Sequence, residues 1–237
     1  MTKWWHLNSE TTARQLETDL HSGLAEQAVA GRREKYGPNQ LREQKGRTPL
    51  RIFIEQFADF MIWVLIGAAL VSGFLKEWVD ALAIVAIVIL NALMGFVQEH
   101  RAERSLQALR KLAAPFSRVI RDGRRVSIPS AELVPGDLVE LEAGDNIPAD
   151  GRIVQHTPNF AVLEASLTGE STPVVKTRLP LEERDIPLAD RANMIYMGTS
   201  VVSGKGRALI AETGMNTELG RIAGMIQSIT RETTPLQ

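Results

Sequence analysis

The sequence predicts a membrane protein of mixed α and β structure, with short N-terminal helices, a transmembrane helical hairpin and a small β-sandwich or jelly-roll-like domain. Two long apolar segments lie close together between residues 57 and 98. After residue 118 apolar and polar positions alternate, which is the period of strands. Glycine, proline and aspartate interrupt this second region at short intervals, as is typical of all-β domains.

The composition excludes several function classes. The chain has 237 residues and a net charge of -1, so no overall field favours nucleic acid as a partner. It contains no cysteine, which excludes disulfides, thiolate metal sites and cysteine nucleophiles. The four histidines are far apart and show no metal-ligand spacing. We therefore expect no nucleic-acid partner and no metal site within this chain.

Residues 1–50 are expected to form a short helical segment. Helices are predicted over Ser9–Leu20 and Leu24–Tyr36, with Ser9 as a candidate cap of the first. The sequence Gly37-Pro38-Asn39 should end the second helix, because glycine and proline interrupt helical geometry.

Residues 51–112 are predicted to form a transmembrane hairpin with a stalk, with spans at about 57–75 and 80–98. Each apolar run is close to the length that crosses about 30 Å of hydrocarbon as a helix. A backbone in lipid must satisfy its own hydrogen bonds, which favours helices. The alternative is a helical hairpin buried in a soluble binding domain. Two such runs joined by only a few residues argue against that alternative.

Basic residues flank the two spans unequally. Four precede the first span, four follow the second, and one lies in the connecting turn. This asymmetry places both ends of the hairpin, and all residues after 100, in the cytoplasm. The basic residues are Arg42, Lys45, Arg47 and Arg51, then Lys76 in the turn, then Arg101, Arg104, Arg110 and Lys111.

Glu55 and Asp59 carry the carboxylates at the cytoplasmic end of the first span. Carboxylates within a membrane are costly and often mark an ion path. A hydrated helix end would tolerate the same residues. Both interpretations remain open at this point.

Residues 113–215 are expected to form the β-domain. Strands Arg118–Arg121 and Arg125–Ile128 flank Asp122-Gly123, a strong hairpin turn signal. Further strands are predicted at Leu138–Glu142, Gly151–Val154, Ala161–Leu167, Ile195–Ser203 and Arg207–Thr213. The predicted core comprises Val119, Val126, Leu138, Leu141, Ile153, Leu163, Val201 and Leu209. Residues 216–237 are expected to be a linker toward a third span, with a helix over Glu218–Ile229 capped by Asn216 or Thr217.

The candidate site is the run Thr168-Gly169-Glu170-Ser171, which follows the strand predicted to end near Leu167. Glycine allows the backbone to turn sharply there. A carboxylate at the tip of a rigid loop can orient or deprotonate water for attack on a phosphoryl or acyl centre. Taken alone, these four residues are equally typical of an ordinary surface turn.

Further motifs accompany it in order. With them the whole chain resembles the N-terminal third of the P-type cation-transporting ATPases, of the calcium type, including their actuator domain. The motifs are Pro135-Gly136-Asp137, Gly144–Gly151, Leu167–Ser171 with Pro173, Val174 and Lys176, Met197-Gly198-Thr199, Gly204, Gly214–Glu218, and Thr234–Gln237.

The resemblance implies a mechanism. Such pumps form an aspartyl phosphate, and the actuator domain rotates and inserts its T-G-E loop to hydrolyse it. Glu170 would then position the attacking water, Thr168 and Gly169 would shape the loop, and Ser171 would support it. The stalks would transmit the rotation to the ion gate. We interpret the aspartates of the other motifs as turn and loop structure, not as catalytic groups.

The family's phosphorylation motif, D-K-T-G-T, is absent from the sequence. We therefore expect this fragment alone to be inactive and to bind no cofactor. ATP and Mg²⁺ would serve the full-length pump. Its partners would be the lipid bilayer, the transported cation, and the phosphorylation, nucleotide-binding and remaining transmembrane parts. The expected location is the plasma membrane.

Calcium is the favoured ion, because the runs Glu55-Gln56-Phe57 and Gln98–Arg101 resemble calcium-type pumps. Sodium, potassium, magnesium and proton transport remain alternatives. Another alternative is a standalone two-span membrane protein whose β-domain binds or regulates a partner.

Overall fold

The computed structural model describes residues 2–41, 53–54, 60–112, 115–183 and 185–229. The chain divides into two compact units. One comprises Met1–Arg42 together with Pro115–Gln237, and the other comprises Glu43–Ala114. The predicted domain boundaries at residues 50, 112 and 215 stay predictions.

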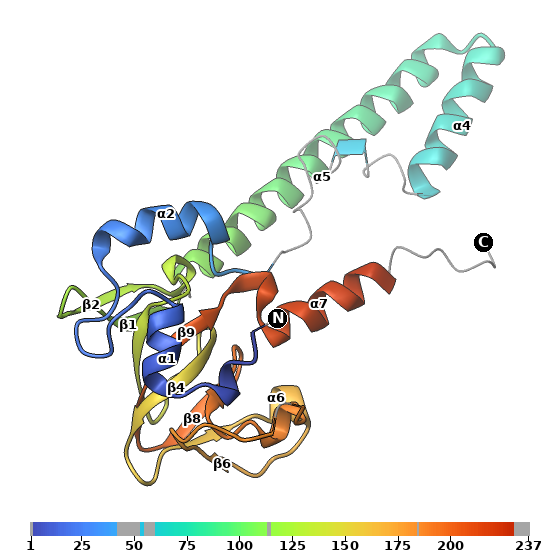
Figure 1. The fold of residues 1–237 in the computed structure, drawn as a ribbon. Helices are drawn as coiled ribbons and strands as arrows, with labels where there is room; N and C mark the ends of the chain where they lie inside the picture. Colours follow the sequence, from blue (N-terminus) through green and yellow to red (C-terminus); the bar gives the residue numbers. More distant parts are fainter. Residues whose placement is uncertain (1, 42–52, 55–59, 113–114, 184, 230–237) are drawn as a thin grey trace. The chain divides into compact units, whose positions relative to one another are not determined.

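The smaller unit is a pair of helices. Helix α4 (Phe60–Phe74) and helix α5 (Trp78–Leu112) lie side by side, joined by a short turn (Figure 1). Within the described residues, one stretch is long and apolar enough to cross a membrane, Trp78–Arg101 of α5. Helix α4 is a shorter apolar helix, and residues 57–59 of the predicted first span lie outside the described part. The transmembrane hairpin is thus seen only as a helical hairpin.

Helices α1 (Ser9–Gln15) and α2 (Glu26–Tyr36) begin the larger unit. The predicted cap is wrong, because the Asn8 side chain, not that of Ser9, accepts from the Thr11 amide at 2.8 Å. The first helix also ends before the predicted Leu20, since Glu17 has a positive φ of 47° that is incompatible with a helix. Gly37, with φ of 75°, ends α2 as expected.

The rest of the larger unit contains two antiparallel sheets. The six-stranded sheet has the order β2-β1-β3-β9-β4-β7, and the three-stranded sheet has the order β6-β5-β8. The strands are β1 (Phe116–Arg121), β2 (Arg124–Pro129), β3 (Leu138–Glu142), β4 (Asp150–His156), β5 (Ala161–Leu163), β6 (Val174–Val175), β7 (Met194–Ile195), β8 (Ser200–Ser203) and β9 (Lys205–Glu212). Helices α6 (Ala165–Thr168) and α7 (Glu218–Ile229) complete it, with 3₁₀ turns at Trp4–His6, Ser130–Glu132, Leu188–Asp190 and Gly214–Asn216.

The predicted hairpin forms between β1 and β2, with Val119 opposite Val126. Asp122 and Gly123 have φ of 46° and 73°, the two positive values that a type I′ turn needs. Two predicted strands are shorter than expected. The strand from Ala161 stops at Leu163 and turns into α6, and the strand from Ile195 is divided at Gly198, where φ is 81°.

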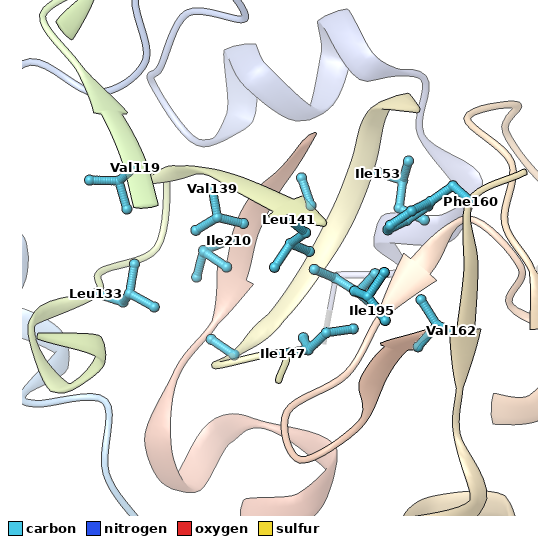
Figure 2. Close-up of a cluster of buried hydrophobic side chains, with 13 residues drawn as sticks. Val119, Leu133, Val139, Leu141, Ile147, Ile153, Phe160, Val162, Ile195 and Ile210 are labelled. Carbon is cyan, nitrogen blue, oxygen red and sulfur yellow. The ribbon is translucent and has the colours of Figure 1, made fainter. Parts of the chain in front are cut away.

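One hydrophobic core takes side chains from both sheets (Figure 2). Figure 2 shows Val119 and Leu133 toward one end of this core, and Phe160, Val162 and Ile195 toward the other. Two predicted core residues are placed differently. Val126 is 43% exposed on the edge strand β2, and Leu163 is half-buried.

Alternate residues of the six-stranded sheet face its other side. There α1 supplies Ala13 and Leu16, which pack in a second cluster with Leu138, Val154 and Leu209. Where α1 covers this face, around Leu138, Val154 and Leu209, the sheet is buried on both sides. The three-stranded sheet and α6 lie toward the opposite side of the domain from α2 (Figure 1).

A candidate catalytic loop

Helix α6 carries the first residue of the candidate site. It is one turn long and ends at Gly169, which has left-handed φ and ψ of 78° and -3°. A side chain at residue 169 would meet nothing within 4 Å, so the backbone conformation, not a lack of space, calls for glycine. The amide of Gly169 donates to the carbonyl oxygen of Ala165 at 3.0 Å.

The hydroxyl of Thr168 fixes the next turn. It donates to the carbonyl oxygen of Glu164 at 3.1 Å and accepts from the amide of Glu170 at 3.2 Å. Glu170 and Ser171 are exposed. Within the described residues the Glu170 carboxylate makes no hydrogen bond or ion pair, so it is available to a group outside this domain.

Two distant motifs meet beneath α6. The Ser166 hydroxyl donates to the carbonyl oxygen of Gly198 at 2.9 Å, and the Gly198 amide donates to the carbonyl oxygen of Ile147 at 3.1 Å. The Met197 amide donates to Oδ1 of Asp150 at 2.8 Å. The motifs around residues 147–150 and 197–199 therefore form the support on which α6 rests.

Asp150 is the buried centre of this support. Its Oδ2 accepts from the Glu218 amide at 2.7 Å, at the start of α7, while Thr217 caps the helix by accepting from the Gly220 amide at 3.0 Å. Burial raises the pKa of Asp150 to about 7, although the amide hydrogen bonds from Met197 and Glu218 oppose the shift.

The other two motif aspartates also hold structure. Asp137 is fully buried and forms a bidentate ion pair with Arg121, with both N–O distances at 2.8 Å. Asp145 contacts Arg118 and accepts from the Glu142 amide at 2.8 Å. These contacts support the interpretation of Asp137 and Asp145 as architectural residues.

One contact next to the candidate site was missed from the sequence. Glu164 and Lys176 form a buried ion pair of 2.5 Å directly before α6 and directly after β6. Lys176 is part of the motif that follows Ser171, but it shares no predicted helix or strand with Glu164, so the pairing could not be read from the sequence.

The other predicted site residues, Glu55 and Asp59, lie outside the described residues. Among those described, no three His, Asp or Glu side chains gather as metal ligands.

Two protein-family models match this chain, one over its N-terminal segment and one over its β-domain. Residues 111–227 match the family model for the P-type ATPase actuator domain, and residues 4–72 match the model for the cation transporter/ATPase N-terminus. The chain belongs to the P-type ATPase family, of which it contains the N-terminal and actuator regions.

Several curated relatives are similar along nearly the whole chain. A calcium-transporting ATPase of Bacillus subtilis is 49% identical over 93% of the chain, and calcium-transporting ATPase 1 of Bacillus cereus is 42% identical over 100%. A probable cation-transporting ATPase F of Mycobacterium bovis is 43% identical over 93%. The chain spans about a quarter of the length of these relatives, 25%, 27% and 24% respectively.

Proposed function

We propose that this chain acts as the actuator and first membrane hairpin of an ATP-driven cation pump, in which Glu170 serves dephosphorylation. The observation that supports this most directly is the geometry of the loop. Its carboxylate is exposed and unpaired in the described part, while the turn beneath it is fixed by hydrogen bonds at Thr168 and Ser166.

The proposed reaction is hydrolysis of an aspartyl phosphate carried by another part of the pump. A water oxygen bonds to phosphorus, the bond between phosphorus and the aspartyl oxygen breaks, and the carboxylate leaves with the electron pair. Glu170 orients the water and takes its proton, which then passes to solvent. Thr168 and Gly169 shape the loop, and Ser171 supports it.

The helical unit is proposed to be a transmembrane hairpin. Large apolar side chains are exposed along both helices, as lipid contact requires; they include Phe60, Leu70, Phe74, Val79, Leu82 and Ile87. The basic residues flanking the hairpin favour a cytoplasmic position for the β-domain. The proposed location of the hairpin is the plasma membrane. Glu55 and Asp59 would line an access path for ions at the cytoplasmic end.

Calcium is the proposed cargo, because the named relatives at 49% and 42% identity are calcium-transporting ATPases. ATP and Mg²⁺ would be used by the longer pump, where ATP supplies the phosphoryl group. Within this chain we assign no residue to their binding.

The test is transport by the full-length pump in inside-out membrane vesicles. We expect ATP-dependent uptake of radioactive Ca²⁺, and a hydroxylamine-sensitive phosphoenzyme that forms only when Ca²⁺ is present. Phosphoenzyme formation driven by Na⁺, K⁺, Mg²⁺ or protons without Ca²⁺ would contradict calcium as the cargo. A carbonate wash should leave the chain in the membrane fraction; its release would contradict the transmembrane hairpin.

A further inference from the structure

The candidate loop is closed at its base by a buried pair of charges. Glu164 Oε1 and Lys176 Nζ lie 2.5 Å apart, and their side chains are 1% and 0% exposed. Glu164 directly precedes α6, and Lys176 directly follows β6. The pair therefore joins the two ends of the segment 165–175, which contains the whole candidate site.

Few backbone contacts hold the C-terminal end of the 165–175 loop. Strand β6 pairs with β5 through only two residue pairs, Ala161 with Val175 and Val162 with Val174. Residues 169–173 between α6 and β6 are exposed. The amide of Lys176 adds one bond to the carbonyl oxygen of Phe160 at 2.9 Å. The Lys176 side chain is thus the main buried anchor at the C-terminal end of the loop.

Glu164, the other residue of the pair, is hydrogen-bonded directly to the turn that carries Glu170. The carbonyl oxygen of Glu164 accepts from the amides of Leu167 and Thr168 and from the Thr168 hydroxyl, at 2.9, 3.0 and 3.1 Å. That hydroxyl holds the Glu170 amide. A displacement of Glu164 would therefore reach Glu170 through two hydrogen bonds.

Stability alone does not account for this pair. Desolvation raises the pKa of Glu164 and lowers that of Lys176, while the attraction between them opposes both shifts. Replacing a buried ion pair with apolar residues of similar size is often neutral or stabilising. Glu164 Oε2 is also buried without a hydrogen-bond partner among the described residues, a further desolvation cost. What the pair supplies is a directional attachment of one loop end to the other.

We propose that Glu164 and Lys176 are positioning residues, a buried clasp that holds the 165–175 loop in the conformation that presents Glu170. This inference rests on the proposed function of Glu170. The clasp touches neither the phosphate nor the water and acts through Thr168.

The first test uses the double variant Glu164→Gln/Lys176→Met in the full-length pump. We expect phosphoenzyme decay to slow by about 10- to 100-fold, the scale of a small misplacement of a catalytic group, with formation unchanged. The matched control is Arg121→Met/Asp137→Asn, which removes another buried ion pair of the same domain. The control should lower thermal stability and leave decay within about twofold of the parent. Equal decay in the clasp variant and the parent would overturn the proposal.

The second test reports on position without activity. Because the chain has no cysteine, Thr172→Cys accepts a single spin label on the loop of the whole chain in detergent. The label should become more mobile in the clasp variant but not in the control, and Glu164→Lys/Lys176→Glu should partly restore order. Unchanged mobility would overturn the clasp. Phosphoenzyme decay at the parent rate in Glu170→Gln would instead overturn the proposed function. The mobility of the spin label would still test whether Glu164 and Lys176 hold the loop.

Discussion

Oδ2 of Asp150 lies 2.7 Å from the backbone nitrogen of Glu218, so the first residue of β4 is hydrogen-bonded to the first residue of α7. The other oxygen of the same carboxylate holds the Met197 amide at 2.8 Å. One buried side chain therefore connects the support of the candidate loop with the helix that leaves the β-domain.

This connection should depend on pH. Because burial raises the pKa of Asp150 from 3.8 to about 7, the folded state binds more protons than the unfolded state between these values. The free energy of unfolding contributed by this group therefore falls as pH rises from about 4 to 7, by at most about 1.4 kcal/mol per pH unit. The decrease levels off about one pH unit above the folded-state pKa of about 7.

The check is urea unfolding of the parent and Asp150→Asn between pH 5 and 8. We expect the stability difference, parent minus variant, to shrink as pH rises, because asparagine does not titrate. A difference that stays constant, or that grows with pH, would contradict the raised pKa.

Substitution at Gly169 should act through the backbone alone. Gly169→Ala places a side chain at φ of 78°, which costs about 1–2 kcal/mol, although the Cβ itself has open space. Gly169→Asn should be tolerated better, because asparagine adopts the left-handed conformation more readily. We expect alanine to slow phosphoenzyme decay in the full-length pump more than asparagine does. Identical rates would show that the left-handed turn is not needed for the reaction.

Arg152 should be a major contributor to folding stability. It is fully buried and donates to the carbonyl oxygens of Leu7, Ile153 and Arg178, at 2.9, 2.6 and 3.0 Å. Arg152→Met leaves these acceptors without their donor, and we expect a loss of about 3 kcal/mol in unfolding free energy.

The matched control is Arg207→Met, because the guanidinium of Arg207 pairs with Glu140 in a partly exposed position. Its cost should stay within about 1 kcal/mol. Both variants are measured by urea unfolding of the whole chain in detergent. Equal effects of the two substitutions would contradict the expected contribution of Arg152 to folding stability.

Local signals in the sequence predicted much of the β-domain. The bounds of β3 and α7 match those expected, because alternation, turn residues and a threonine cap are encoded within a few positions. The turn at Asp122-Gly123 has the positive φ values that this dipeptide favours. The candidate loop at Glu170 could be proposed from the sequence because its motif is continuous, and its role stays a prediction.

Features that depend on distant contacts were not predictable in this way. The strand from Ala161 stops at Leu163, where Glu164 leaves the extended conformation with ψ of 17° and begins α6, and the Glu164 side chain meets Lys176, twelve residues later. Likewise, Leu138 and Leu209 face a second core only because α1 covers the outer face of the sheet. The alternation of apolar and polar residues within a strand identifies neither Lys176 as the partner of Glu164 nor α1 as the cover of the sheet.

The most direct measurement is the decay of the phosphoenzyme in Glu170→Gln of the full-length pump, after labelling with radioactive ATP and a chase with unlabelled ATP. The side chain is exposed, so the fold and phosphoenzyme formation should be unaffected. Glu182→Gln, another exposed glutamate, provides the control. We predict decay at least about 10²-fold slower in Glu170→Gln, the scale of a positioned acid–base group, and unchanged in the control. A decay rate equal to that of the parent would contradict the central claim that Glu170 serves dephosphorylation.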